Sequence, residues 1–392
     1  MSGEHPQFEG GGPDFHLAGG VLTVDLAALV DNWRALARSS APAEASAVVK
    51  ADAYGLGARH VVPALARAGC RRFFVALPHE GAVVRAAAPK AEIYVFSGPL
   101  SAETGPFFRE HRLVPVLNST RDVAIWESEG WLDGHRLPAA LHVDTGFNRL
   151  GMTPAEATQF AKDNALTGAV RISLVVSHLA CADEPQHPLN RQQIEAFQAV
   201  RALFPDAESS LANSAGILLG GAFVGELTRP GISLYGGVAS SAGGFAARPV
   251  VRAQARILQV RHAAAGETVG YGAAARLSRD SIVAIAGAGY ADGLHRSGSG
   301  AGVPLRTAAP AGGTGFVGGL RVPILGRISM DLTAFDVTEL GADGVAAGDM
   351  VELFGPNIPI EEAAQAAGTI SYELLTGIGR RYHRVYVWGD NQ

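Results

Sequence analysis

Short apolar runs alternate with stretches of helical periodicity between residue 25 and about residue 235. The first helical stretch follows Asp25, a residue type that caps helix N-termini, and a second clear one covers 190–204 with Asn190 as a possible cap. Runs typical of buried strands lie at 47–49, 73–77, 92–96, 113–117, 139–143, 172–177, 209–212 and 227–235. Eight strands that alternate with helices predict a (β/α)₈ barrel rather than an open, doubly wound sheet.

The pattern changes at residues 236–250, which are rich in glycine, alanine, serine and proline. Beyond them, short β-branched runs predict strands at 255–261, 281–286, 322–328, 332–337 and 349–354. Helical periodicity returns only at about 360–375, and the glycine-rich stretch 297–320 is typical of hairpin loops. We therefore predict an α/β chain with three parts: a flexible tail over 1–17, a barrel over 18–245, and a smaller, mostly β domain over 246–392.

The composition narrows the class of protein. With 37 acidic and 32 basic residues, the chain lacks the basic excess typical of nucleic-acid binding. Cys70 and Cys181 do not have the spacing of metal ligands or of a disulfide framework, which favours a reducing compartment. The sequence begins without a basic segment followed by an apolar one, and no apolar run reaches the roughly 18 residues that span a bilayer. We expect a cytoplasmic protein without nucleic-acid or membrane partners and without a bound metal.

Polar residues follow the predicted strands, where a (β/α)₈ barrel carries its reactive groups. They are Lys50, Arg149, His178, Asn213, Ser214 and Arg229. Lys50 lies in AVVKADAYGLGA, where glycines let the backbone approach a ligand closely. A lysine at such a position is either a desolvated nucleophile or a solvated, salt-bridged side chain.

Eight motifs extend this pattern over nearly the whole chain after residue 18: KADAYGLG, HVDTGFNRLG, SHLACAD, LANSAG, TRPGISLYG, VGYGAA, GYADG and GRISMD. In this order they resemble the alanine racemase family, pyridoxal-phosphate enzymes of fold type III. The resemblance implies that the chain interconverts L- and D-alanine, either to supply D-alanine for peptidoglycan or in alanine catabolism. It also implies a homodimer in which the second domain of one subunit completes the barrel site of the other.

The resemblance also implies how the pyridoxal phosphate is held. Lys50 would form a Schiff base with the cofactor. The phosphate would be bound by the Tyr54 and Ser214 hydroxyls, beside Asn213, and by the backbone amides of Gly231 and Ile232. A barrel commonly binds phosphate at the loops after strands seven and eight, where Ser214 and Gly231 are predicted to lie.

Arg229 is the residue that most restricts which reactions a bound pyridoxal phosphate would support. The resemblance places its guanidinium against the pyridine nitrogen of the cofactor. Because a guanidinium keeps its proton, the pyridine would stay unprotonated and would be a weaker electron sink. This arrangement restrains decarboxylation and transamination while it still allows the acidity of the Cα–H to increase.

Racemisation needs two acid–base groups, one on each face of the substrate carbanion. The resemblance assigns these roles to Lys50 and to Tyr271 of VGYGAA. A free tyrosine, with a pKa of about 10, is a poor base at neutral pH, so positive neighbours must favour its phenolate. The resemblance implies that His178 links Tyr271 with Arg229 and that Arg149 orients Tyr271 and the substrate carboxylate.

Two further residues are expected to limit the substrate to small amino acids. The resemblance places the backbone of Met330, in GRISMD, against the substrate. It places Tyr290, in GYADG, at the passage that leads to the site. For Met330 taken alone, packing in a core is the alternative interpretation.

Three places depart from the family pattern. His142 stands seven residues before Arg149, where some members carry a carbamylated lysine, so that modification cannot form. Ser210 stands where some relatives have a histidine behind the pyridine-facing arginine, which is therefore expected to be held differently. A phosphate-contacting tyrosine of some relatives falls on Arg380, and Tyr382 is the candidate replacement.

Three alternatives remain at the level of sequence. A broad-specificity amino-acid racemase is the nearest of them. A pyridoxal-phosphate decarboxylase of basic amino acids is less favoured, because such enzymes need a protonated pyridine and Arg229 argues against one. A non-enzymatic pyridoxal-phosphate carrier made of the barrel alone would not need the long segment after residue 250.

Overall fold

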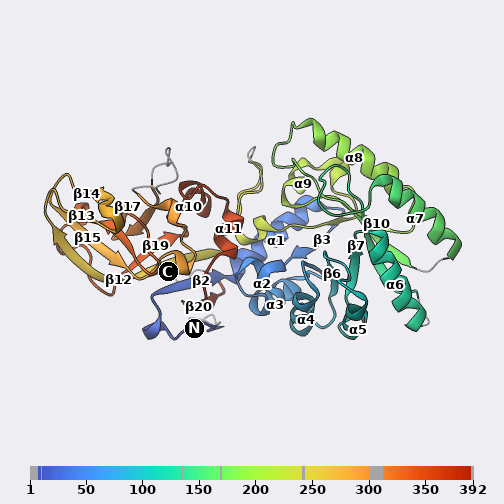
Figure 1. Ribbon diagram of the computed structural model, residues 1–392, viewed down its shortest axis with the longest axis horizontal. Helices are drawn as coiled ribbons and strands as arrows, with labels where there is room; N and C mark the ends of the chain where they lie inside the picture. The colour runs from blue at the N-terminus through green and yellow to red at the C-terminus, as the bar shows by residue number, and fades with distance from the viewer. Residues whose placement is uncertain are drawn as a thin grey trace, which may run out of the picture. The chain divides into compact units, whose positions relative to one another are not determined.

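The computed structural model describes residues 8–9, 11–133, 136–167, 170–240, 243–300 and 312–389. The chain divides into two compact units (Figure 1). The barrel unit contains Leu29–Leu234 and Val238–Ala247. The β unit joins the N-terminal residues up to Ala28 to Tyr235–Gly237 and to the chain from Arg248 onward. Each unit has its own sheet and its own core.

Parallel strands form the centre of the barrel unit. In the order of their pairing they are β10 (Glu208–Ser210), β9 (Arg171–Val176), β8 (Pro138–His142), β7 (Val114–Leu117), β6 (Glu92–Val95), β5 (Arg72–Val75) and β4 (Ala47–Val48). β3 (Glu44–Ala45) precedes β4 in one extended run and pairs in parallel with β11 (Leu227–Thr228). On its other side, β11 is joined to β10 by hydrogen bonds from Glu226 N to Ser209 O and from Arg229 N to Ala212 O. The strands therefore close into a barrel, and the fold prediction is confirmed.

Helices connect the strands and lie outside them (Figure 1). They are α1 (Leu26–Ser40), α3 (Ala58–Ala68), α4 (Pro78–Ala87), α5 (Gly105–Glu110), α6 (Thr120–Asp133), α7 (Pro154–Thr167), α8 (Pro188–Arg201) and α9 (Ser214–Leu219). Asp25 caps α1 as predicted, because its Oδ1 accepts hydrogen bonds from Ala27 N and Ala28 N.

The predicted cap of α8 is wrong. The helix begins two residues before Asn190, at Pro188, and the His187 side chain accepts a hydrogen bond from Leu189 N. Proline suits the first helical position because its missing N–H would have no partner there. Asn190 is instead buried and donates to the carbonyls of Cys181 and Glu184, which fixes the loop before the helix.

Nine of the described strands form the sheet of the β unit. Their order is β1 (Phe8–Glu9), β20 (Tyr382–Val387), β2 (Gly20–Asp25), β12 (Val251–Ala263), β15 (Ser281–Ala286), β18 (Thr333–Asp336), β17 (Leu320–Leu325), β16 (Thr314–Val317) and β19 (Met350–Phe354). β19 also pairs with β12, so the strands from β12 to β19 form a closed antiparallel ring. A short hairpin, β13 (Thr268–Val269) with β14 (Ala275–Arg276), and the helices α10 (Ile360–Ala366) and α11 (Ser371–Thr376) complete the unit. The predicted second domain of mostly β structure is present.

The N-terminal segment belongs to the β unit, not to the barrel. β2 pairs in parallel with β20 and antiparallel with β12, and its Leu22 and Val24 are fully buried. The boundary predicted at residue 18 is therefore wrong, because a local apolar run does not reveal which distant strand it will join. Within the predicted tail, β1 pairs with Val385 and Tyr386, while residues 1–7 and 10 lie outside the described ranges. Residues 301–311 of the predicted hairpin loops also lie outside them.

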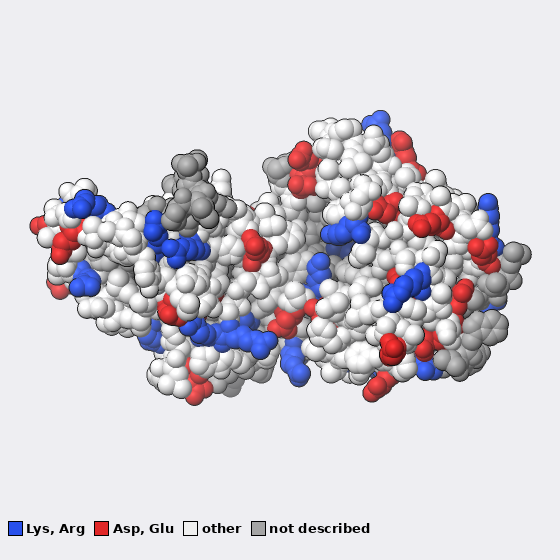
Figure 2. Space-filling model, viewed as in Figure 1, with Lys and Arg blue, Asp and Glu red and all other residues white. Residues whose placement is uncertain are grey.

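On the face that Figure 2 presents, acidic and basic side chains are interspersed over the barrel unit, so no large field of one sign covers this part of it. Within the described ranges, every helix is too short or too polar to span a bilayer.

Candidate functional site

Lys50 lies directly after β4 and begins α2 (Lys50–Tyr54). The four residues that follow it, Ala51 to Tyr54, have φ angles between +52° and +56°. Side chains other than glycine cost about 1–2 kcal/mol each in this left-handed region. The turn is held by two carboxylates: Glu80 accepts a hydrogen bond from Ala51 N at 2.6 Å and Asp52 accepts one from Ala58 N at 2.7 Å. The backbone directly after Lys50 is therefore strained, and strained backbone is common at functional sites.

The surroundings of Lys50 favour its neutral amine. Burial lowers the pKa of Lys50, the nearby Arg149 lowers it further, and Glu80 acts in the opposite direction. The Lys50 Nζ lies 6.0 Å from the centre of the Phe96 ring. A desolvated amine with a lowered pKa is the form in which lysine acts as a nucleophile or a base.

Three of the predicted phosphate ligands meet at the barrel end. Gly231 N donates a hydrogen bond to Ser214 Oγ at 2.8 Å. A side chain at position 231 would bring its Cβ to 2.5 Å from the Tyr54 hydroxyl oxygen, so only glycine lets that hydroxyl lie against this backbone. Asn213 caps α9 by accepting from Gly216 N, and Ile232 is fully buried in the turn after Gly231. Two hydroxyls and a backbone amide that lie this close together fit a phosphate group.

Arg229 is buried, with 3% of its surface exposed. Its Nη1 donates to both the carbonyl and the hydroxyl of Ser210, and its Nη2 donates to Ser177 O at 2.5 Å. Burial lowers the pKa of Arg229 to about 10, so the guanidinium stays charged at neutral pH. Ser210, which departs from the family pattern, thus fixes the arginine through two of its own oxygens.

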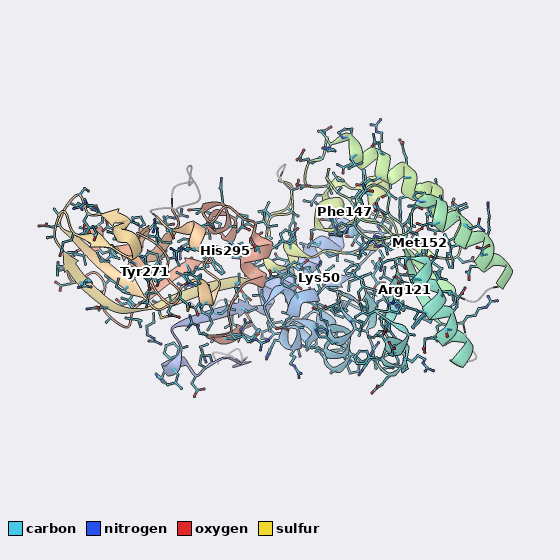
Figure 3. The ribbon with its side chains drawn as sticks, in the orientation of Figure 1. Lys50, Arg121, Phe147, Met152, Tyr271 and His295 are labelled. Carbon is cyan, nitrogen blue, oxygen red and sulfur yellow. The ribbon has the colours of Figure 1, made fainter. Side chains whose placement is uncertain are left out.

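Arg149 and His178 are connected through a residue that the sequence did not reveal. The Arg149 guanidinium lies 4.1 Å above the centre of the Phe147 ring. The Phe147 ring packs edge-on against His178, at 5.3 Å between centres and 74° between planes. Asp144 holds this loop by accepting from the backbone amides of Gly146, Phe147 and Arg149. Figure 3 labels Phe147 and Lys50 on the barrel unit.

His142 occupies the position of the missing lysine and is held in one tautomer. Asn118 uses its amide group to donate to Phe96 O and Val116 O, so its Oδ1 accepts from His142 Nδ1 at 2.7 Å. The Nδ1 therefore carries the proton. Burial and the positive Arg229 lower the pKa of His142 to about 4.

His178 is also neutral at pH 7, because burial and the positive charges of Arg229 and Arg149 lower its pKa to about 3. The permanently charged groups around it are Arg149 and Arg229. A barrel end with this balance of charge suits an anionic ligand.

The two histidines predict how stability depends on pH. Both have a pKa far below the value of about 6.5 expected in the unfolded chain. Below pH 6.5 the unfolded state binds more protons, so the free energy of unfolding should fall as the pH falls from 6.5 toward 4, and their full contribution should be present above pH 6.5. Urea unfolding at several pH values measures this slope. The His142→Gln variant should show a smaller slope, and equal slopes would contradict the assignment.

The other predicted residues lie on the β unit. Tyr271 is 67% exposed and lines a cavity of about 470 Å³ together with Arg327, Ser329 and Leu332. Gly272 leaves room for the Arg327 guanidinium, since a Cβ there would lie 2.7 Å from Arg327 Nη1. Figure 3 labels Tyr271 on this unit.

Tyr290 and Met330 lie on two loops that are bonded to each other. Tyr290 N donates to Ser329 O and Ala291 N donates to Met330 O, both at 3.0 Å. The Tyr290 side chain is 39% exposed and that of Met330 is 53% exposed. The core position considered for Met330 is therefore wrong. The predicted site residues thus form two groups, one on the barrel unit and one on the β unit.

Tyr382 does not fit the suggested role of a phosphate ligand. It is 3% exposed in β20, and its ring lies against Gly20, where a Cβ would come within 2.8 Å of the ring. Burial raises the pKa of its hydroxyl. The alternation of polar and apolar residues near the C-terminus did not distinguish a core tyrosine from a ligand.

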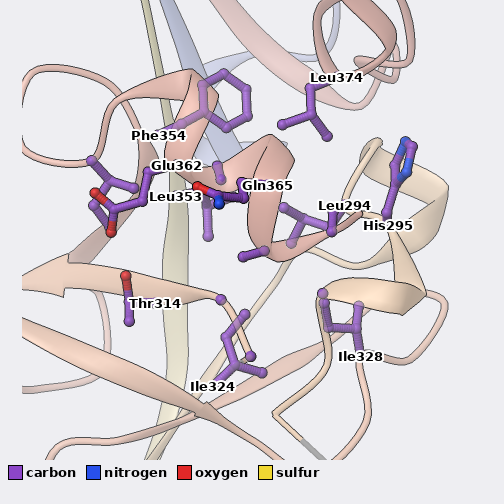
Figure 4. Close-up of a pocket in the computed structure, with 17 residues that line it drawn as sticks. Leu294, His295, Thr314, Ile324, Ile328, Leu353, Phe354, Glu362, Gln365 and Leu374 are labelled. Carbon is purple, nitrogen blue, oxygen red and sulfur yellow. The ribbon is translucent and has the colours of Figure 1, made fainter. Parts of the chain in front are cut away.

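A second cavity of the β unit, of about 440 Å³, is lined mainly by apolar side chains (Figure 4). They include Leu294, Ile324, Ile328, Leu353, Phe354 and Leu374. None of the residues predicted for the site lines this cavity. In the described ranges, no cluster of three or more histidine, cysteine or acidic side chains could hold a metal ion.

Known proteins resemble both parts of the chain. Residues 24–239 match the family model "Alanine racemase, N-terminal domain" and residues 250–386 match "Alanine racemase, C-terminal domain". The alanine racemase of Rhizobium meliloti is 50% identical over 96% of this chain and 99% of its own length. The biosynthetic alanine racemase of Agrobacterium fabrum is 50% identical over 94% of each chain.

A solved structure agrees with these relatives. It is that of alanine racemase from Bartonella henselae with covalently bound pyridoxal phosphate, and it is 37% identical to this chain. The two structures superpose with a TM-score of 0.87 over 94% of this chain and 100% of the other. The family models together cover most of the residues of both units. The chain belongs to the alanine racemase family.

Proposed function

We propose that this protein interconverts L- and D-alanine with pyridoxal phosphate bound covalently to Lys50. The observation that carries the proposal is the barrel end itself. There a desolvated lysine follows one strand, and the Tyr54 and Ser214 hydroxyls meet at Gly231 as donors suited to a phosphate. Membership of the family and the covalently bound cofactor of the Bartonella henselae structure support the same assignment.

The residues of the barrel end fit the cofactor group by group. Tyr54, Ser214 and the amides of Gly231 and Ile232 would hold the phosphate, and Arg229 would face the pyridine nitrogen. When bound, pyridoxal phosphate increases the acidity of the substrate Cα–H. A charged Arg229, fixed by Ser210 and Ser177, keeps its own proton and so favours racemisation over decarboxylation.

Two residues would move the substrate proton. Lys50 would act on one face of Cα and Tyr271 on the other, as racemisation requires. Arg149 would bind the substrate carboxylate, and its stacking on Phe147 supports a fixed orientation for that contact. Arg149 would supply the positive charge that a tyrosine base needs, and the neutral His178 would link Tyr271 with Arg229. Tyr290 and Met330 would limit the size of the side chain.

We also propose that the protein works as a homodimer in the cytoplasm. Six exposed aromatic and aliphatic side chains of the β unit support a partner surface: Tyr271, Tyr290, Met330, Leu332, Ile370 and Tyr372. The barrel end of a second copy is the occupant proposed for it. Both cysteines are free, which supports a reducing compartment. The 50% identity to the biosynthetic enzyme of Agrobacterium fabrum supports supply of D-alanine as the cellular role.

The experiment that tests the function measures the conversion of L-alanine into D-alanine. We expect purified protein, incubated with pyridoxal phosphate and L-alanine, to form D-alanine until the two enantiomers are equal, as measured by chiral chromatography. A protein loaded with cofactor that leaves L-alanine unchanged would refute the proposal. Parallel incubations with serine, lysine and arginine test the broad-specificity alternative, and release of carbon dioxide from lysine or arginine would indicate a decarboxylase.

A further inference from the structure

Three separate segments of the β unit meet at the guanidinium of Arg381. Its Nε donates to Asp292 Oδ1 and its Nη2 donates to Asp292 Oδ2, both at 2.7 Å. Its Nη1 donates to Asp331 Oδ1 at 2.8 Å. Asp292 lies in GYADG and Asp331 in GRISMD, so one side chain joins both loops to the start of β20.

The Asp292 arm of this cluster is the buried one. Asp292 is 6% exposed, and its Oδ2 also accepts from Gly289 N at 2.9 Å, which shapes the turn that carries Tyr290. Its carbonyl accepts from Gly379 N. A two-point contact between arginine and a carboxylate fixes direction as well as distance. This arm therefore sets the position of the GYADG loop against the segment before β20.

The Asp331 arm is exposed and fixes the second loop. Asp331 is 57% exposed, and it directly follows Met330 in the chain. The two loops are also joined by the hydrogen bonds from Tyr290 N and Ala291 N described above. Gly289 allows this approach, because a Cβ there would lie 2.3 Å from Ser329 O and 2.5 Å from Met330 O.

We infer that Arg381 is a positioning residue that holds Tyr290 and Met330 at a fixed separation and thereby restricts the substrate to a small side chain. Arg381 itself acts only through Asp292 and Asp331, and the inference rests on the proposed function. An exposed ion pair contributes little to stability. The contact between Arg381 and Asp331 is therefore better explained as a means of positioning the Met330 loop than as a contribution to the free energy of unfolding.

The test uses two variants. Asp331→Asn keeps the size of the side chain and Arg381→Lys keeps its charge, but neither keeps the full contact of the guanidinium with both Asp292 and Asp331. The matched control is Glu339→Gln, because the Arg279–Glu339 pair is an equally short, exposed ion pair of the same unit, at 2.7 Å. We expect Asp331→Asn and Glu339→Gln, which change only exposed ion pairs, to keep a Tm within about 3 °C of the parent protein.

The kinetic readout is the preference for alanine over serine. A pocket distinguishes one extra group by roughly 10–200-fold, so partial loss of positioning should raise the serine-to-alanine ratio of kcat/KM by about threefold or more in Asp331→Asn and Arg381→Lys. The KM for alanine should rise while kcat changes less. Hydrogen exchange over 289–293 should become faster in these two variants, and Glu339→Gln should match the parent in every measurement.

Each outcome decides the inference. An unchanged serine-to-alanine ratio in both variants would overturn it, as would an equal change in Glu339→Gln. A parent protein that racemises neither amino acid overturns the proposed function and the inference with it. A parent that racemises alanine, with variants that keep its selectivity, overturns the inference alone.

Discussion

Replacement of Lys50 by alanine should abolish covalent binding of the cofactor. It should also lower kcat/KM for alanine by more than about 10⁴-fold, the upper end of what one positioned acid–base group contributes, because the variant loses an attachment as well as a base. The reason lies in the desolvated amine, which no other described lysine shares: Lys90 and Lys162 are exposed. The visible absorbance of the purified variant and its rate of D-alanine formation measure the two effects.

The small number of lysines makes this prediction unusually direct to check. The sequence contains only Lys50, Lys90 and Lys162. Borohydride reduction of the loaded protein, followed by peptide mass mapping, should place the cofactor on the peptide that contains Lys50. Lys90→Ala is the matched control and should keep both the absorbance and the activity. Cofactor found on Lys90 or Lys162, or an unchanged spectrum in Lys50→Ala, would remove the central assignment.

Replacement of Tyr271 by phenylalanine should affect the two enantiomers unequally. The change removes only the hydroxyl, so the proton transfer on one face of Cα is lost while Lys50 keeps its own. We expect exchange of the Cα hydrogen of L-alanine with solvent deuterium to fall by roughly 10²–10⁴-fold, the range for one general acid–base group. Exchange from D-alanine should persist, and mass spectrometry of each enantiomer measures both rates.

A second tyrosine of the same unit provides the control. Tyr290→Phe also removes one hydroxyl from an exposed aromatic ring, but it should change KM without any preference for one enantiomer. Equal loss of exchange from L- and D-alanine in Tyr271→Phe, with the cofactor still bound, would contradict the role of the hydroxyl. The comparison separates a base from a residue that merely lines the site.

Much of the barrel could be predicted because its strands are continuous apolar runs bounded by polar residues. The predicted runs at 73–77, 92–96 and 172–177 differ from β5, β6 and β9 by at most two residues at each end. Both faces of such strands are buried, which gives a strong local signal. The same signal placed Lys50 and Arg229 at strand ends without any knowledge of their contacts.

Other features depended on contacts between residues far apart in the sequence. The sequence of β2 does not indicate that β12 and β20 are its partners, because strand pairing depends on the tertiary fold. Phe147 could not be distinguished from a core phenylalanine, although its loop motif was visible in HVDTGFNRLG. The partner of His142, Asn118, lies at the end of another strand and has no sequence signal of its own. The role of Arg381 emerges only when GYADG and GRISMD are seen to share one guanidinium.

The position of β2 has a consequence for how the chain folds during synthesis. Every barrel strand from β3 to β11 lies between residues 44 and 228, so the barrel can form while the ribosome is still translating. β2 is made before any of them, but β20 begins 357 residues after Asp25 (382 − 25). At a synthesis rate of about 5–20 residues per second, β2 waits roughly 20–70 s for that partner. Until then β2, an apolar strand made early in the chain, has an open edge, and this is the interval in which a chaperone would be of most use to this protein.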